Sequence, residues 1–121
     1  CHDWQAALVP LYLRTCFADT NVGRASAVLT IHNLKFQGIY DRKMIQYWSG
    51  LPDYVFNKDC LTQNWLDANM LKGGITYCNR LTTVSNTYAG EIQTEEYGEV
   101  LRAKGIVQGT EGITRIRSEE L

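Results

Sequence analysis

The sequence predicts a single α/β domain with a Rossmann-like parallel sheet flanked by helices. Two buried, strand-like segments, 27–31 and 81–84, alternate with helical segments, which is the order that a parallel sheet requires. The first strand is almost continuously apolar, as strands covered on both faces tend to be. A chain of 121 residues, of which 45% are apolar and 21% charged, has room for one domain with a modest core.

The first elements follow from apolar spacing and from punctuating residues. Asp3 stands at an N-cap position before apolar residues with helical spacing, so a helix is expected from Trp4 to about Cys16. Pro10 falls inside this helix, removes one backbone hydrogen bond and is expected to kink it. A turn at 21–24 then leads to the strand at 27–31.

The second half of the chain continues the alternation. A loop is expected over 32–40, a short helix over 41–48 and a longer helix over 64–79. The strand at 81–84 is followed by a helix from Ser85 or Asn86, both good caps, to about Gln93. Ligands of such folds gather beyond the carboxyl ends of the strands.

The expected helix at 64–79 has two apolar faces. One face carries Leu66, Met70 and Tyr77, and the other carries Leu71, Ile75 and Cys78. Two apolar faces predict burial between layers. Gly73 and Gly74 would each cost about 1 kcal/mol against alanine in a helix, so close packing or a local break is expected there.

Charge and cysteine content exclude several classes of function. A net charge of −1 gives no basic footprint for nucleic acid or an anionic membrane, and no apolar run approaches the length of a bilayer span. The four cysteines, at positions 1, 16, 60 and 78, show no C-x-x-C spacing, which favours free thiols in a reducing cytoplasm. The chain begins at Cys1, shows no signal peptide and is expected to be part of a larger protein.

Two kinds of site are considered and disfavoured. Cys1, His2 and Asp3 are adjacent potential metal ligands, but a zinc site needs three or four converging ligands and no second cluster exists, so no metal site is predicted. A hydrolase triad of Ser85, a histidine and Asp3 lacks the G-x-S-x-G turn that exposes such a serine, and it ranks last.

Three blocks of sequence carry the strongest signal. They are 1–10 (CHDWQAALVP), 29–38 (LTIHNLKFQG) and 71–89, which ends in LTTVSNTYA. Together they resemble the signatures of bacterial glycogen synthases and plant starch synthases, which belong to glycosyltransferase family five and have the two-domain GT-B architecture. The resemblance covers about Cys1 to Glu99 and implies that the chain is part of the N-terminal domain.

The resemblance implies transfer of glucose from ADP-glucose to the non-reducing end of an α-1,4-glucan with retention, without a metal or other cofactor. The partners would be an α-glucan acceptor and a sugar nucleotide, in the cytoplasm or, for a plant enzyme, in a plastid. The family pocket matches Asp3 and His32 as catalytic residues and Trp4 and Asn33 as substrate-binding residues.

Each of these four residues also has a purely structural interpretation. Asp3 is suited to cap its helix, and Trp4 at a helix start is commonly a core residue. His32 after a buried strand is commonly a hydrogen-bonded residue of the sheet edge, and Asn33 is a natural turn former. The shared pocket of the family favours function for all four together.

Other stretches depart from the family pattern. Lys72-Gly73-Gly74 resembles a phosphate loop, but it lies in the predicted helix, so the glycines are assigned to packing and Lys72 to no nucleotide. We expect a partial catalytic domain over 1–104 and a divergent tail over 105–121, in which Gln108 and Glu111 replace the family's Asn and Asp.

The groups that bind the donor diphosphate in the family match nothing in this chain, so it is expected to be inactive alone. The alternative is a non-catalytic carbohydrate-binding or scaffold remnant. An exposed sheet edge also predicts a tendency to self-associate.

Overall fold

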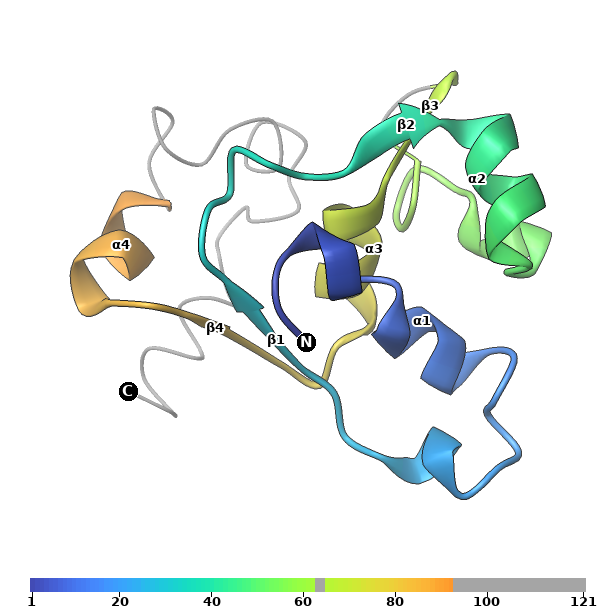
Figure 1. The fold of residues 1–121 in the computed structure, drawn as a ribbon, viewed down its shortest axis with the longest axis horizontal. Coiled ribbons are helices and arrows are strands. Elements are labelled where there is room, and N and C mark those ends of the chain that lie inside the picture. Colours follow the sequence, from blue (N-terminus) through green and yellow to red (C-terminus); the bar gives the residue numbers. More distant parts are fainter. Residues whose placement is uncertain (63–64, 93–121) are drawn as a thin grey trace.

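The computed structural model describes residues 1–62 and 65–92. Its strands are β1 (Val28–Ile31), β2 (Ile39–Asp41), β3 (Asp67–Asn69) and β4 (Arg80–Thr83). Its α-helices are α1 (Val9–Arg14), α2 (Arg42–Ser49), α3 (Met70–Tyr77) and α4 (Asn86–Glu91), and short 3-10 helices cover Trp4–Ala6, Val22–Arg24 and Asp53–Val55. Figure 1 shows β1 and β4 at one side of the molecule, near α4, with α2, β2 and β3 at the other.

The predicted parallel sheet is confirmed. Strands β1 and β4 pair in parallel, with Leu29 opposite Leu81. On the other edge of β1, His2 forms a parallel bridge to Thr30, whose amide donates to the carbonyl of Cys1 (2.8 Å) and whose carbonyl accepts from the amide of Asp3 (2.9 Å). Residues 1–3 therefore lie beside β1. Because the two segments are parallel, the chain leaves both at the same edge of the sheet, at Trp4 and at His32.

A second, antiparallel pair was not predicted. Strands β2 and β3 pair with Ile39 opposite Asn69, whereas the sequence indicated loop for 32–40 and helix from residue 64. Three-residue strands are too short to show an alternating pattern, and the pairing is decided by a long-range contact. Helix α3 consequently starts at Met70, and position 64 lies outside the described residues.

The single helix expected from Trp4 to Cys16 was wrong. The chain forms a 3-10 helix over Trp4–Ala6 and then α1, in whose first turn Pro10 lies. A proline in that position loses no intrahelical hydrogen bond and has a suitable φ, so Pro10 starts a helix instead of kinking one. Asp3 is no cap, because its side chain makes no capping hydrogen bond.

The remaining helices begin at polar caps close to where the sequence indicated. The amide of Met44 donates to Asp41 at the start of α2 (3.0 Å), and the amide of Tyr88 donates to Ser85 at the start of α4 (3.0 Å). Asn69 caps α3 by accepting from the amide of Lys72 (3.0 Å). Each side-chain oxygen satisfies an amide that would otherwise lack a partner in the first helical turn.

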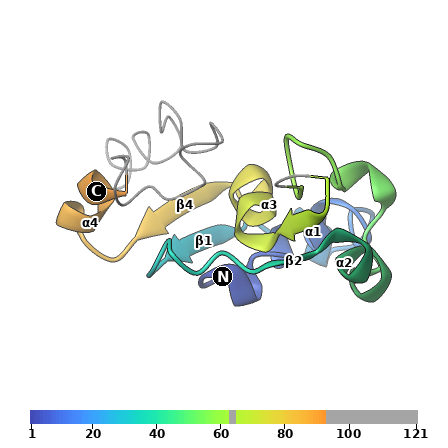
Figure 2. The same cartoon turned by 90° about the horizontal axis from the view of Figure 1, so that it is seen from above.

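Helix α3 lies between two cores, as its two apolar faces predicted. Figure 2 shows it between the β1–β4 pair and α2. Leu71, Ile75 and Cys78 pack in the core under β1 and β4, while Met70 and Tyr77 pack against the core around α1 and α2. Leu66, assigned to the same face as Met70 and Tyr77, is exposed because it precedes the helix.

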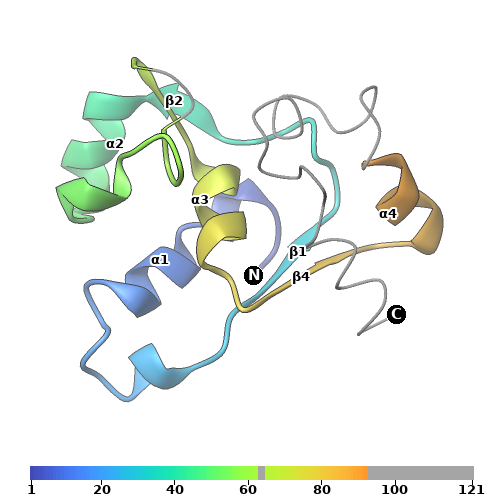
Figure 3. The ribbon, with the colours of Figure 1, turned by 180° about the vertical axis from the view of Figure 1, so that it is seen from behind.

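The two glycines of α3 mark the closest approaches. A Cβ at Gly74 would lie 2.7 Å from the carbonyl oxygen of Ala7, and one at Gly73 would lie 2.5 Å from Leu61 Cδ2. Both distances are shorter than van der Waals contact, so the expected close packing is confirmed. Figure 3, from behind, shows α3 crossing close to the N-terminal segment and α1.

Within the described ranges, no helix has the length and apolar character needed to cross a membrane. All four cysteines are free thiols. Burial raises the pKa of Cys60 to about 12 and that of Cys78 to about 11.

Candidate functional site

The candidate site is built on the loop that leaves β1. Asp3 lies beside it, because residues 1–3 run along the edge of β1. One carboxylate oxygen, Oδ1 of Asp3, accepts from the amide of His32 (2.7 Å) and, at longer range, from that of Asn33 (3.5 Å). The structure thus brings together three of the four predicted residues, and Asp3 organises the loop rather than a helix.

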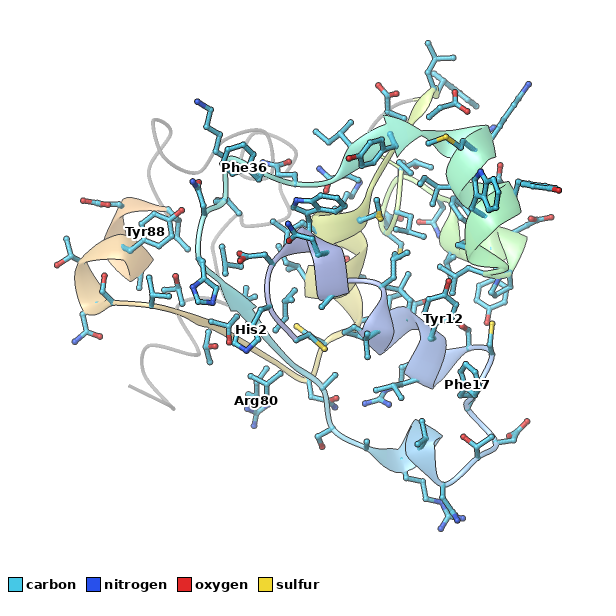
Figure 4. All side chains as sticks on the ribbon, viewed as in Figure 1. His2, Tyr12, Phe17, Phe36, Arg80 and Tyr88 are labelled. Atoms are coloured by element: carbon cyan, nitrogen blue, oxygen red, sulfur yellow. The ribbon has the colours of Figure 1, made fainter. Side chains whose placement is uncertain are left out.

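The next two amides of this loop are also held by side chains. Leu34 donates to the hydroxyl of Tyr88 in α4 (2.8 Å), and Lys35 donates to the side-chain oxygen of Asn33 (3.0 Å). Four consecutive amides, those of residues 32–35, therefore donate to side-chain oxygens. Figure 4 shows Tyr88 on α4, facing the loop that carries Phe36.

A buried amide pair fixes the far end of the loop. Gln37, only 4% exposed, donates from Nε2 to the carbonyl of Leu34 (3.0 Å) and accepts at Oε1 from Asn69 (2.7 Å). Its backbone carbonyl accepts from the amide of Leu71 (3.0 Å) at the start of α3. Paired buried amides are costly to separate, so the loop is joined firmly to the second half of the fold.

His32 is exposed, and its ring contacts that of His2. Nδ1 of His2 lies 3.1 Å from Nε2 of His32, and the ring centroids are 5.3 Å apart. Neither ring hydrogen-bonds to any other group of the described part of the chain. Figure 4 places His2 beside the β1–β4 pair.

Trp4 lies at the wall of a neighbouring depression. Gly38, with φ at 66°, packs against the indole so closely that a Cβ there would lie 2.6 Å from Trp4 Cε3. The Tyr40 ring is 5.8 Å from that of Trp4 and tilted by 51°. The depression has a volume of about 310 Å3 and is lined by Trp4, Lys35, Phe36, Gln37, Gly38, Ile39 and Tyr40.

The structural interpretations are partly correct. Asn33 does form a turn, since its oxygen accepts from the amide of Lys35, but its side-chain NH2 makes no hydrogen bond within the described residues. Trp4 is half-buried and packs against the core, yet it also lines the depression. Turn formation and packing therefore leave both side chains with a face or a donor for a ligand.

Three residues of this network were not singled out as site residues by the sequence: His2, Gln37 and Tyr88. His2 was considered only as a metal ligand or as a member of a triad. Tyr88 meets Leu34 across 54 residues of sequence, a contact that no local pattern indicates. Gln37 lies in the second motif block, 29–38, so its place in that motif could have indicated that it belongs to the site.

Residues of the other sites that were considered make contacts within the fold. No cluster of three or more His, Cys, Asp or Glu residues within 1–62 and 65–92 is arranged to hold a metal ion. The hydroxyl of Ser85 serves as the cap of α4. Lys72 is 3% exposed, and its amino group donates to the carbonyls of Lys58 and Thr62 (2.5 Å for the latter), which braces a loop.

The amino-acid sequence is similar to those of known glycogen synthases. The chain is 49% identical over 121 residues to a glycogen synthase of Thermotoga petrophila and 47% identical over 122 residues to one of Lachnospira eligens. These alignments cover 99% and 100% of the chain but 23% of each relative, so the chain spans about a quarter of their length.

A solved structure has the same fold. The catalytic domain of starch synthase IV from Arabidopsis thaliana, bound to ADP and acarbose, superposes with a TM-score of 0.79 at 31% identity, covering 87% of this chain and 22% of that one. Residues 1–107 match the profile of the starch synthase catalytic domain. This chain therefore belongs to the starch synthase catalytic domain family, and its fold is part of a GT-B glycosyltransferase domain.

Proposed function

We propose that this chain is the part of a glycogen (starch) synthase that holds the sugar. The intact protein would transfer glucose from ADP-glucose to the non-reducing end of an α-1,4-glucan with retention, using no metal ion or other cofactor. The similar glycogen synthases and the ADP- and acarbose-bound starch synthase domain support this class of donor and acceptor. The bacterial sources of the relatives favour the cytoplasm over a plastid.

The observation that carries the proposal is the constrained loop after β1. Because four successive amides are held by side chains, His32 and Asn33 are presented at fixed positions beside Asp3. A sugar pocket needs preorganised donors and acceptors of this kind, since a polar group that loses water without a new partner costs about 1–3 kcal/mol.

Each side chain has a group left for a ligand. His32 offers Nδ1, and Asn33 offers its NH2 group. Asp3 uses Oδ1 for the loop, and Oδ2 makes no hydrogen bond in the described residues, which leaves an acceptor for a sugar hydroxyl. A carboxylate near the pocket would also stabilise positive charge that develops on the transferred sugar ring. The depression beside Trp4 offers an aromatic wall to an acceptor glucosyl unit.

The test is the rate of glucosyl transfer from ADP-glucose to glycogen by the intact protein and its His32→Ala variant. The variant is expected to lose about 100-fold in kcat, because a group placed for the transition state is removed. Lys43→Ala, an exposed change on α2, is the matched control and should leave the rate unchanged. Residues 1–121 alone should release no ADP. Equal rates for the intact protein and His32→Ala would reject the pocket.

The partner proposal extends to self-association of the isolated chain. In the described residues no strand pairs with the outer side of residues 1–3, which form the N-terminal edge of the sheet, and exposed strand edges template pairing with another chain. Light scattering after gel filtration should find the isolated chain partly dimeric at high concentration, and a strictly monomeric chain would refute this.

A further inference from the structure

We propose that His2 is a positioning residue that orients the His32 imidazole toward the sugar. The inference rests on the function proposed above, since it assumes that His32 contacts the transferred glucose. It concerns a different residue, however, and a specific pair of ring nitrogens.

The backbone brings His2 to this place independently of its side chain. Residues 1–3 pair with Thr30 through two backbone hydrogen bonds, and His2 stands opposite Thr30 in a parallel bridge. His32 is the first residue after β1, two residues beyond Thr30, and its ring meets that of His2. The amide of His32 is tied to Asp3, which lies next to His2 in the sequence.

The side-chain contact then restricts the one freedom that remains to His32. Its main chain is fixed by Asp3, but an exposed imidazole still rotates about χ1 and χ2. The 3.1 Å contact joins Nδ1 of His2 to Nε2 of His32, and one proton between them makes a hydrogen bond. Nε2 of His32 is thereby occupied, and Nδ1 is the nitrogen left to meet a sugar hydroxyl. His2 selects both the rotamer and the nitrogen that faces the substrate.

This role accounts for the contact between the exposed rings of His2 and His32, each of which would be solvated without the other. Folding is not expected to require the His2 side chain. Its ring is exposed, and the backbone pairing with Thr30 does not require it.

The test uses substitutions that imitate one ring nitrogen at a time in the intact protein. The side-chain amide of asparagine reaches the position of Nδ1, and that of glutamine reaches the position of Nε2. Because Nδ1 of His2 makes the contact, His2→Asn should retain kcat within about threefold, while His2→Ala and His2→Gln should each lose roughly 5- to 20-fold. KM for ADP-glucose should change less than kcat. Gln5→Ala, an exposed change in the same segment, is the control and should match the unmodified protein.

The ring nitrogens of His32 provide a second measurement that a merely structural role would not move. In protein labelled with 15N-histidine, the His32 signals should report one dominant tautomer, retained in His2→Asn and averaged in His2→Ala. Equal kcat losses in the Asn, Gln and Ala variants would overturn the inference, as would an unchanged kcat in His2→Ala.

These failures are distinct from failure of the proposed function. If His32→Ala is slow and His2→Ala is not, only the positioning role is rejected. If His32→Ala itself keeps full activity, the pocket and the positioning role are rejected together.

Discussion

At the scale of single residues, Asp3 shows how a site residue is forced into its place. Its backbone has φ 56° and ψ −168°, a region that non-glycine residues avoid at a cost of about 1–3 kcal/mol. The conformation persists because the amide of Asp3 donates to Thr30 while the carboxylate accepts from the loop after β1. The hydrogen bonds that hold Asp3 in its strained conformation therefore also order the loop after β1.

Substitutions at Asp3 separate its loop contacts from its charge. Asp3→Asn keeps an oxygen that accepts from the amide of His32, so its free energy of unfolding should lie within about 0.5 kcal/mol of that of the unmodified protein. Asp3→Ala loses the acceptor and should be destabilised by about 1–2 kcal/mol. Under the proposed function, the full-length protein should transfer glucose more slowly with either change, since both lack the carboxylate. Chemical denaturation and initial rates measure the two effects. Matching stabilities of the Asn and Ala variants would show that the loop does not depend on this oxygen.

At the scale of elements, α3 determines how close the two halves of the fold come. The face with Leu71 packs under β1 and β4, and the face with Met70 packs toward α1 and α2. Gly74 lets the helix backbone approach that of Ala7. Asn69, immediately before α3, caps the helix and also donates to Gln37 in the loop that leaves β1. Packing of the helix and placement of the loop are consequently coupled.

Two glycine substitutions should have opposite signs. Gly74→Ala places a methyl group 2.7 Å from a carbonyl oxygen and should destabilise the protein by about 1–3 kcal/mol. Gly90→Ala, in α4, meets no atom of the described residues within 4 Å and should stabilise the protein by about 0.4–1 kcal/mol, because alanine has less freedom in the unfolded chain. Thermal unfolding of the two variants is the measurement. A stabilising Gly74→Ala change would contradict the close approach.

At the scale of the whole molecule, burial of two thiols contributes to the dependence of stability on alkaline pH. Burial raises the pKa of Cys60 to about 12 and that of Cys78 to about 11, above the ordinary value of 9.0. Between these values the unfolded chain releases protons that the folded chain keeps, so stability must fall as pH rises. Below the ordinary value both states are protonated, and these thiols add no pH dependence.

We expect the unfolding temperature to decrease by several degrees from about pH 8.5 to 10, with native Cys60 and Cys78 resisting alkylation at the lower pH. A Cys60→Ala, Cys78→Ala double variant should show a shallower decrease, despite a lower starting value from lost packing. A decrease of equal steepness in the double variant would assign the effect to other groups.

The division into a domain at 1–104 and a tail at 105–121 stays a prediction, as do the substitutions at Gln108 and Glu111, because these positions lie outside the described residues. The roles of Asp3, Trp4, His32 and Asn33 also stay predictions until kinetics test them.

The sequence by itself determined the strands β1 and β4 and the parallel class of their sheet, the starts of α2 and α4 and the double-sided burial of α3. These features follow from local spacing, caps, apolar periodicity and the alternation of strands with helices. The motif blocks likewise indicated the family and brought Asp3, His32 and Asn33 to attention. Only the tertiary structure decided that Asp3 holds a loop and not a helix, that Pro10 begins a helix, and that β2 pairs with β3. The positions of Asp3 and of β2 each depend on a partner far away in the chain, Thr30 for Asp3 and Asn69 for Ile39, and local patterns carry no information about which distant group will pair.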